Sequence, residues 1–217
     1  NAFSLGIFLG AGILHLLPDA EHHWLMWQGP TEFPWPGLIA GLGILGVLAL
    51  EQGLLGGSED IGKMTNDDKS FYPYLLCIVL SVHSLIAGIS MGLEKVMLST
   101  VVLIVALLAH KGSAAFALGV SLRKADFSSR SYRGLIILFS TMVPLGIMSG
   151  MIFSTLFTGK ADAGFESVFD ALAAGTFLYI ALIDILPEVF ESETDTWIKL
   201  LLTALGFAVM TAIAIIA

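Results

Sequence analysis

Two histidines stand inside long apolar stretches of the sequence, where an ionisable side chain is costly. His83 lies in a run that continues to Leu93, and His110 lies in the next apolar run along the chain. Ionisable groups at membrane depth usually mark an ion path, a proton relay or a buried pair. Imidazole nitrogens also bind zinc and other first-row divalent metals. The two histidines are therefore candidate metal ligands, against the alternative of two satisfied hydrogen bonds between helices.

The composition places these histidines in a membrane. Hydrophobic residues make up 56% of the 217 residues and charged residues only 13%, whereas a soluble domain carries about a quarter charged residues. The formal net charge of -8, with no basic patch to offset it, argues against a nucleic-acid partner. The sequence predicts an all-α integral membrane protein, folded as a single polytopic transmembrane domain over residues 1–217 and in contact with the lipid bilayer.

Seven apolar runs are long enough to cross the bilayer as helices, which takes about 20 residues each. Alternating β-barrel periodicity is absent, so a helical bundle is the expected fold. Residues 19–36 carry acids, three tryptophans and three prolines, a composition typical of an interfacial loop with aromatic anchors. The seven runs cover residues 2–18, 37–56, 71–93, 97–122, 134–157, 166–190 and 197–217.

The distribution of lysine and arginine predicts how the bundle is oriented. These residues gather in the loops on one side, which the positive-inside rule makes cytoplasmic. The N-terminus of this chain is then cytoplasmic and its C-terminus outside, in the plasma membrane or a bacterial inner membrane. The third and fourth runs are antiparallel, and a rise of about 1.5 Å per residue puts His83 and His110 near mid-membrane. Two imidazoles at equal depth can share one ion.

Further polar groups could line a path to and from the two histidines. Glu94 shares a helix face with His83 and is expected at the outer mouth. Asp184 and Glu188 are four residues apart around Pro187, and Glu51 lies near the inner end of the second run. At the outer end of the first run, acids and histidines could collect cations, although His22 and His23 are expected to be solvated loop residues. That group consists of His15, Asp19, Glu21, His22 and His23.

Small residues on the third run predict close helix packing. Ser84, Gly88 and Gly92 repeat every four residues, which lets a neighbouring helix approach closely. The segment Gly88–Gly92 also fits G-x-S-x-G, but that signature denotes a nucleophile only at a strained turn. Ser90 is about 10 Å along the helix from His83, too far for a hydrogen bond. An intramembrane hydrolase would need His110 or His15 as its base, and an enzyme is not the preferred interpretation.

The order and spacing of these motifs resemble the ZIP family, the zinc- and iron-regulated-transporter-like proteins that carry divalent metals into the cytoplasm. The resemblance implies eight helices, of which the first is missing before the seven runs, and a homodimer. It implies Zn2+ as substrate, with Fe2+ and other divalent metals as further candidates. The matching stretches are GAGILHLLPDA (10–20), HSLIAGISMGLE (83–94), HKGSAAFALGVSL (110–122), MVPLGIMSG (142–150) and IDILPE (183–188).

The resemblance also implies which residues bind the metal. Asp19 matches an acidic position at the entrance and Glu51 one at the exit. Lys111 stands where some members have a metal-bridging acid, so a second metal is not expected, and Lys111 is expected to pair with Asp184 or Glu188. The implied ligands are His83, Ser84, His110 and Asp184, whereas the family's usual carboxylates are replaced by Ala87, Ala114 and Val143.

The preferred interpretation is a divalent metal transporter, most simply of zinc, that moves metal toward the cytoplasm. The metal would bind between the His83 and His110 helices, and one group of helices would move against another. Because the usual carboxylates are missing, a non-transporting relative that serves as a metal sensor or interaction subunit is the alternative.

Overall fold

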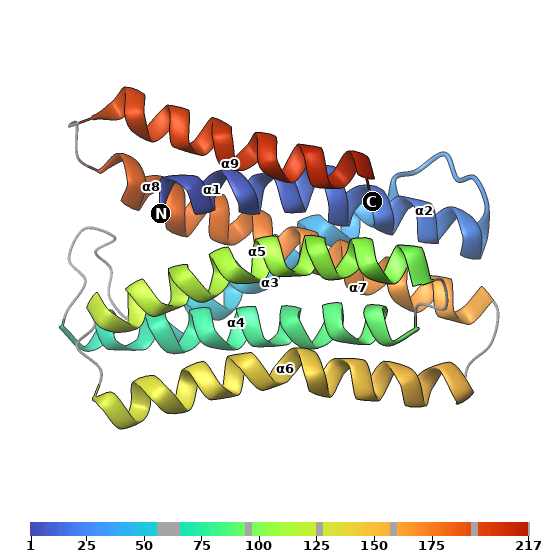
Figure 1. Ribbon diagram of the computed structural model, residues 1–217, viewed down its shortest axis with the longest axis horizontal. Helices are drawn as coiled ribbons and strands as arrows, with labels where there is room; N and C mark the ends of the chain where they lie inside the picture. Colours follow the sequence, from blue (N-terminus) through green and yellow to red (C-terminus); the bar gives the residue numbers. More distant parts are fainter. Residues whose placement is uncertain (56–65, 94–96, 125–127, 157–159, 192–194, 217) are drawn as a thin grey trace.

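The computed structural model describes residues 1–55, 66–93, 97–124, 128–156, 160–191 and 195–216. Within these ranges each of the seven predicted runs corresponds to one helical segment (Figure 1). The helices are α1 (Ala2–Gly10), η1 (Ala11–Leu16) and α2 (Leu17–Gln28) in one continuous rod, then α3 (Trp35–Leu55), α4 (Asn66–Leu93), α5 (Met97–Lys124), α6 (Ser129–Leu156), the second rod α7 (Lys160–Tyr179), η2 (Ile180–Ile185) and α8 (Leu186–Phe190), and α9 (Thr196–Ile216).

The helices of the described chain have the lengths and compositions that a membrane requires. Four segments are long and apolar enough to cross a bilayer, and three shorter apolar helices accompany them. The predicted all-α membrane fold is therefore confirmed. The four long segments are Ala2–Gln28, Ser129–Thr155, Ala161–Phe190 and Thr196–Ile215, and the shorter ones are Trp35–Ala49, Leu76–Ile89 and Ala114–Arg123.

The helices pack as two groups. Helix α4 lies along α6, whereas α1 lies along α9 and α7 packs against both α2 and α3. Contacts between the α4–α6 pair and the remaining helices are sparser and run mainly from α4 to α5 and α7. In Figure 1, α4 and α5 run in opposite directions, as their short separation in sequence requires. The structure thus joins an α4–α6 pair to a larger group of helices through a narrower set of contacts.

Glycines hold the α4–α6 pair at close range. A Cβ added to Gly88 would lie 2.9 Å from the Cα of Gly146 and would collide with the carbonyl oxygen of Val143. A Cβ on Gly92 would lie 3.0 Å from the Cα of Gly150. Only residues without a side chain allow two helix backbones to approach this closely.

The prediction of an interfacial loop over residues 19–36 was wrong for the first half of that range. Helix α2 continues to Gln28, and Gly29, with φ of 81°, turns the chain away from it. Polar contacts with α7 allow this stretch to continue as a helix, although Glu21, His22 and Gln28 are exposed. The hydroxyl of Ser167 donates to the carbonyl oxygen of Ala20 at 2.7 Å, and His23 contacts acids on α7.

Two π-helical turns mark corresponding places in the two long rods. The turn η1 precedes Leu17-Pro18, and η2 precedes Leu186-Pro187. Proline lacks an N–H, so a regular helical hydrogen bond is lost at each site. The wider π turn is a local accommodation that often occurs at functional positions.

We expect Gly88→Ala to destabilise the α4–α6 pair by about 2 kcal/mol, because the new methyl group overpacks a backbone contact. The matched control is Gly46→Ala, since nothing lies within 4 Å of a Cβ at that position. Thermal unfolding in detergent measures both. Equal midpoints for the two variants would contradict the close α4–α6 contact.

Candidate functional site

His83 lies at the boundary between the two groups of helices. Its side chain is buried in α4 with a residue exposure of 4%, and Ser84 beside it is 3% exposed. The imidazole packs against the ring of Phe177 on α7, with 3.9 Å between ring centroids and 37° between planes. Phe177 in turn meets Phe8 of α1 edge-on at 5.0 Å. Aromatic rings from the larger group thus cover one side of this histidine.

Lys111 on α5 is a cationic side chain whose charge acts on His83. Its ammonium donates to the carbonyl oxygen of Phe139 at 3.4 Å. The same nitrogen lies 4.3 Å from the centroid of the Phe139 ring. A cation over an aromatic face is stabilised by the ring quadrupole. Glu188, one expected partner of Lys111, instead accepts a hydrogen bond from the side chain of Asn1 at 2.7 Å. The lysine is therefore bound to α6, next to the α4–α6 contact.

Several predicted site residues fall outside what the structure describes. Glu94 lies outside the described residues. Helices α3, α5 and η2 contain Glu51, His110 and Asp184, whose side chains are outside the described set. The convergence of His110 and Asp184 on His83 therefore stays a prediction.

Two of the positions where the resemblance implies carboxylates are packed as apolar positions here. Ala114 is 3% exposed in α5 and Val143 is 8% exposed in α6, where its carbonyl faces Gly88. Among the side chains that the structure describes, no three from His, Cys, Asp and Glu are grouped so that they could hold a metal ion. A complete metal-binding set at His83 would need side chains from beyond the described ones.

A second cluster of ionisable groups joins α2 to α7. The Nδ1 atom of His23 lies 3.1 Å from Oδ2 of Asp170, and its Nε2 atom lies 3.4 Å from Oε2 of Glu166. Nearby, Nδ1 of His15 lies 2.9 Å from Oδ2 of Asp19. An imidazole can donate to two carboxylates at once when it is protonated. His23 thus links two acids of one helix to another helix.

Sequence reasoning assigned His23 to a solvated loop, which was wrong, and it overlooked its two partners. Glu166 and Asp170 are four residues apart at the start of an apolar helix, so they share one face. That spacing was a usable signal, because two acids on one face of a membrane helix require a partner. The predicted entrance residue Asp19 is paired with His15 within its own helix, and its side chain is 40% exposed.

The sequence of this chain is similar to those of zinc transporters. Residues 56–214 match the family model described as ZIP zinc transporter. The zinc transporter ZIP2 of Homo sapiens is 30% identical over 99% of this chain and 84% of its own length. ZIP2 of Mus musculus is 29% identical over 98% and 83%, and ZIP1 of Bos taurus is 28% identical over 100% and 77%. The similarity therefore extends over nearly the whole chain.

We expect His23→Leu to lower the free energy of unfolding by about 2 kcal/mol or more, because Asp170 would stay buried without its imidazole partner. The control is His22→Leu, since His22 is exposed on the neighbouring face of α2. Thermal unfolding at neutral pH compares the two. An equal loss in both variants would show that the bridge to α7 does not stabilise the protein.

Proposed function

Because this chain belongs to the ZIP family of zinc transporters, we propose that it carries zinc across the membrane toward the cytoplasm as a single polytopic domain. It is a member of a transporter family and not an enzyme. The observation that carries the proposal is the burial of His83 in an apolar helix at the boundary of two helix groups. A buried imidazole is costly, and a zinc ligand is a functional reason to keep one.

The proposed metal site joins α4, α5 and η2. His83 supplies a nitrogen ligand, and His110 on the antiparallel α5 supplies a second. Ser84 and Asp184 add oxygen ligands, in keeping with the mixed nitrogen and oxygen sets that zinc accepts. The same donors accept iron and other divalent ions, which makes Fe2+ a secondary substrate. With few carboxylates, this site would hold zinc weakly enough to release it.

Lys111 is proposed to limit the site to one metal. Its ammonium is fixed by the carbonyl oxygen and ring of Phe139, close enough to His83 to interact with it electrostatically. A fixed positive charge repels a second divalent cation and shortens the residence of the first. The lysine would thus place a positive charge where the resemblance implies a metal-bridging acid.

Acidic residues are proposed to form the approaches to this site. Asp19 and Glu94 would attract metal at the outer mouth, and Glu51 and Glu188 would receive it on the inner side. The contact between Asp19 and His15 keeps that carboxylate in place, while its 40% exposure leaves it accessible to a hydrated cation.

Alternating access is proposed to move the α4–α6 pair against the larger helix group. The close glycine contact makes the pair a unit, and few contacts bind it to its surroundings. Phe177 covers one side of His83 across the boundary between the groups. Relative movement would separate the two rings and open the imidazole to the metal, as in transporters whose helix bundles rock around a fixed site.

Zinc uptake into proteoliposomes tests the transport role. We expect His83→Ala to reduce uptake at least about tenfold, since one ligand of the proposed site is lost. The control is His22→Ala, because His22 is an exposed histidine on α2. Wild-type protein that binds zinc without uptake above empty vesicles would contradict transport and support a sensor or interaction subunit.

Zinc binding should weaken as the pH falls below about 6, because imidazole binds metal only in its neutral form. Protons compete for the same nitrogens, so the affinity is greatest above the pKa of the ligands and is lost below it. Titration of zinc at pH 7.5 and 5.5 measures the effect. Equal affinity at the two values would rule out histidine as the dominant ligand.

A further inference from the structure

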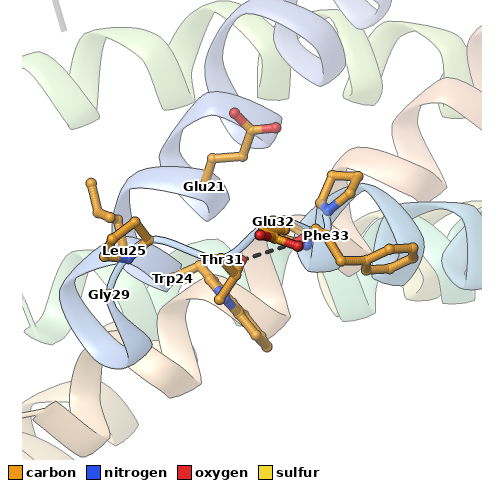
Figure 2. A pocket seen from close by; sticks show the side chains of 10 residues that line it. Glu21, Trp24, Leu25, Gly29, Thr31, Glu32 and Phe33 are labelled. Carbon is orange, nitrogen blue, oxygen red and sulfur yellow. Dashed lines mark hydrogen bonds between the residues drawn. The ribbon is translucent and has the colours of Figure 1, made fainter.

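A cavity of about 560 Å³ lies where the end of α2 meets its connection to α3 (Figure 2). Its walls combine two carboxylates, from Glu21 and Glu32, with the aromatic rings of Trp24 and Phe33. Leu25 and three prolines complete the apolar part. Figure 2 shows these side chains coming from two segments, the last turns of α2 and the connection that follows. The volume falls within the range of small-molecule sites, about 300–1,000 Å³.

The walls of this cavity are held in place by their own contacts. The hydroxyl of Thr31 donates to the carbonyl oxygen of Phe33 at 3.0 Å, which tightens the connection. Trp35 lies 4.9 Å from the ring of Phe33 and 6.2 Å from that of Trp24, measured between centroids. Because the rings brace one another, their faces are presented in fixed positions.

The length of the first rod places this cavity at the membrane surface. Ala2–Gln28 has 27 residues, which at 1.5 Å each gives a rod of about 40 Å, against about 30 Å for the hydrocarbon core. The rod is thus longer than the core, and its polar end with Trp24 and Trp27 is the end expected in the headgroup layer. Leu25 and Met26, which are 51% and 56% exposed, provide apolar surface beside the cavity for the upper part of an acyl chain.

The chemistry of the walls selects a particular cation. None of the lining residues carries a positive charge, and two carry carboxylates, so the cavity favours a cation over a phosphate. Aromatic faces attract soft ammonium groups, as in the aromatic cages that bind choline. A divalent metal needs several converging oxygen or nitrogen ligands, and no group of three metal-ligating side chains exists among the described residues.

We propose that this cavity binds the ammonium headgroup of a zwitterionic phospholipid, such as phosphatidylcholine or phosphatidylethanolamine. The ammonium lies between the carboxylates of Glu21 and Glu32, with Trp24 and Phe33 beside it, and the glycerol backbone leaves toward Leu25. The bound lipid fixes the α2–α3 connection at the membrane surface. This site is separate from metal transport and does not depend on it.

Native mass spectrometry of the full chain in detergent tests the proposal, with phosphatidylcholine and phosphatidylglycerol of the same acyl chains as probes. We expect the wild-type chain to retain phosphatidylcholine about fivefold more strongly than phosphatidylglycerol. The double variant Glu21→Gln with Glu32→Gln should lose this preference. The control double variant, Asp162→Asn with Glu191→Gln, removes the same charge outside the cavity and should keep it.

Three results would overturn the proposal. Equal retention of the two lipids by the wild-type chain would indicate unspecific lipid around the bundle. Equal loss in both double variants would assign the preference to net charge. Displacement of the lipid by free choline at matching concentration, or by Zn2+, would make the occupant a soluble ammonium compound or a metal. The readout is lipid retention and not zinc uptake, so failure here leaves the transport proposal intact.

Discussion

The cost of placing an imidazole inside an apolar helix bundle is the constraint on which the rest of this structure depends. His83 is buried, and the structure surrounds it with an aromatic ring from α7 and a small residue on its own helix. Without water, each polar atom at that depth must be satisfied by protein or by a ligand. In the proposed site a metal ion would meet that need while it is bound, which would link the stability of the helix boundary to the transported ion.

The close contact between α4 and α6 holds the helix that carries His83 against one neighbour. Two glycines on each helix bring the backbones together, so the helix that carries His83 is bound to α6 more firmly than to α7. Lys111 adds to this through Phe139 of α6. The helix that carries His83 thus has a close partner on one side and a boundary with fewer contacts on the other. Such an arrangement suits movement of a site between two faces of a membrane.

The larger helix group is stabilised by polar contacts of a different kind. His23 of α2 joins Glu166 and Asp170 of α7, and the hydroxyl of Ser167 binds the backbone of α2. These contacts allow the polar stretch around His23 to continue as helix and to lengthen the first rod. The aromatic cavity lies at the end of that stretch, where α2 meets its connection to α3.

Local patterns in the sequence determined the helices and the resemblance to a family of metal transporters. Apolar runs of membrane length are a property of neighbouring residues, and so is the repeat of Ser84, Gly88 and Gly92 on one helix face. The choice of partner required the tertiary structure, because Phe177 reaches His83, and Phe139 reaches Lys111, from helices distant in the chain. The extent of α2 also required the tertiary structure. Its polar composition is typical of a loop, but His23 finds its partners on α7. Spacing along a helix shows which residues share a face, but only the packed bundle decides what that face meets.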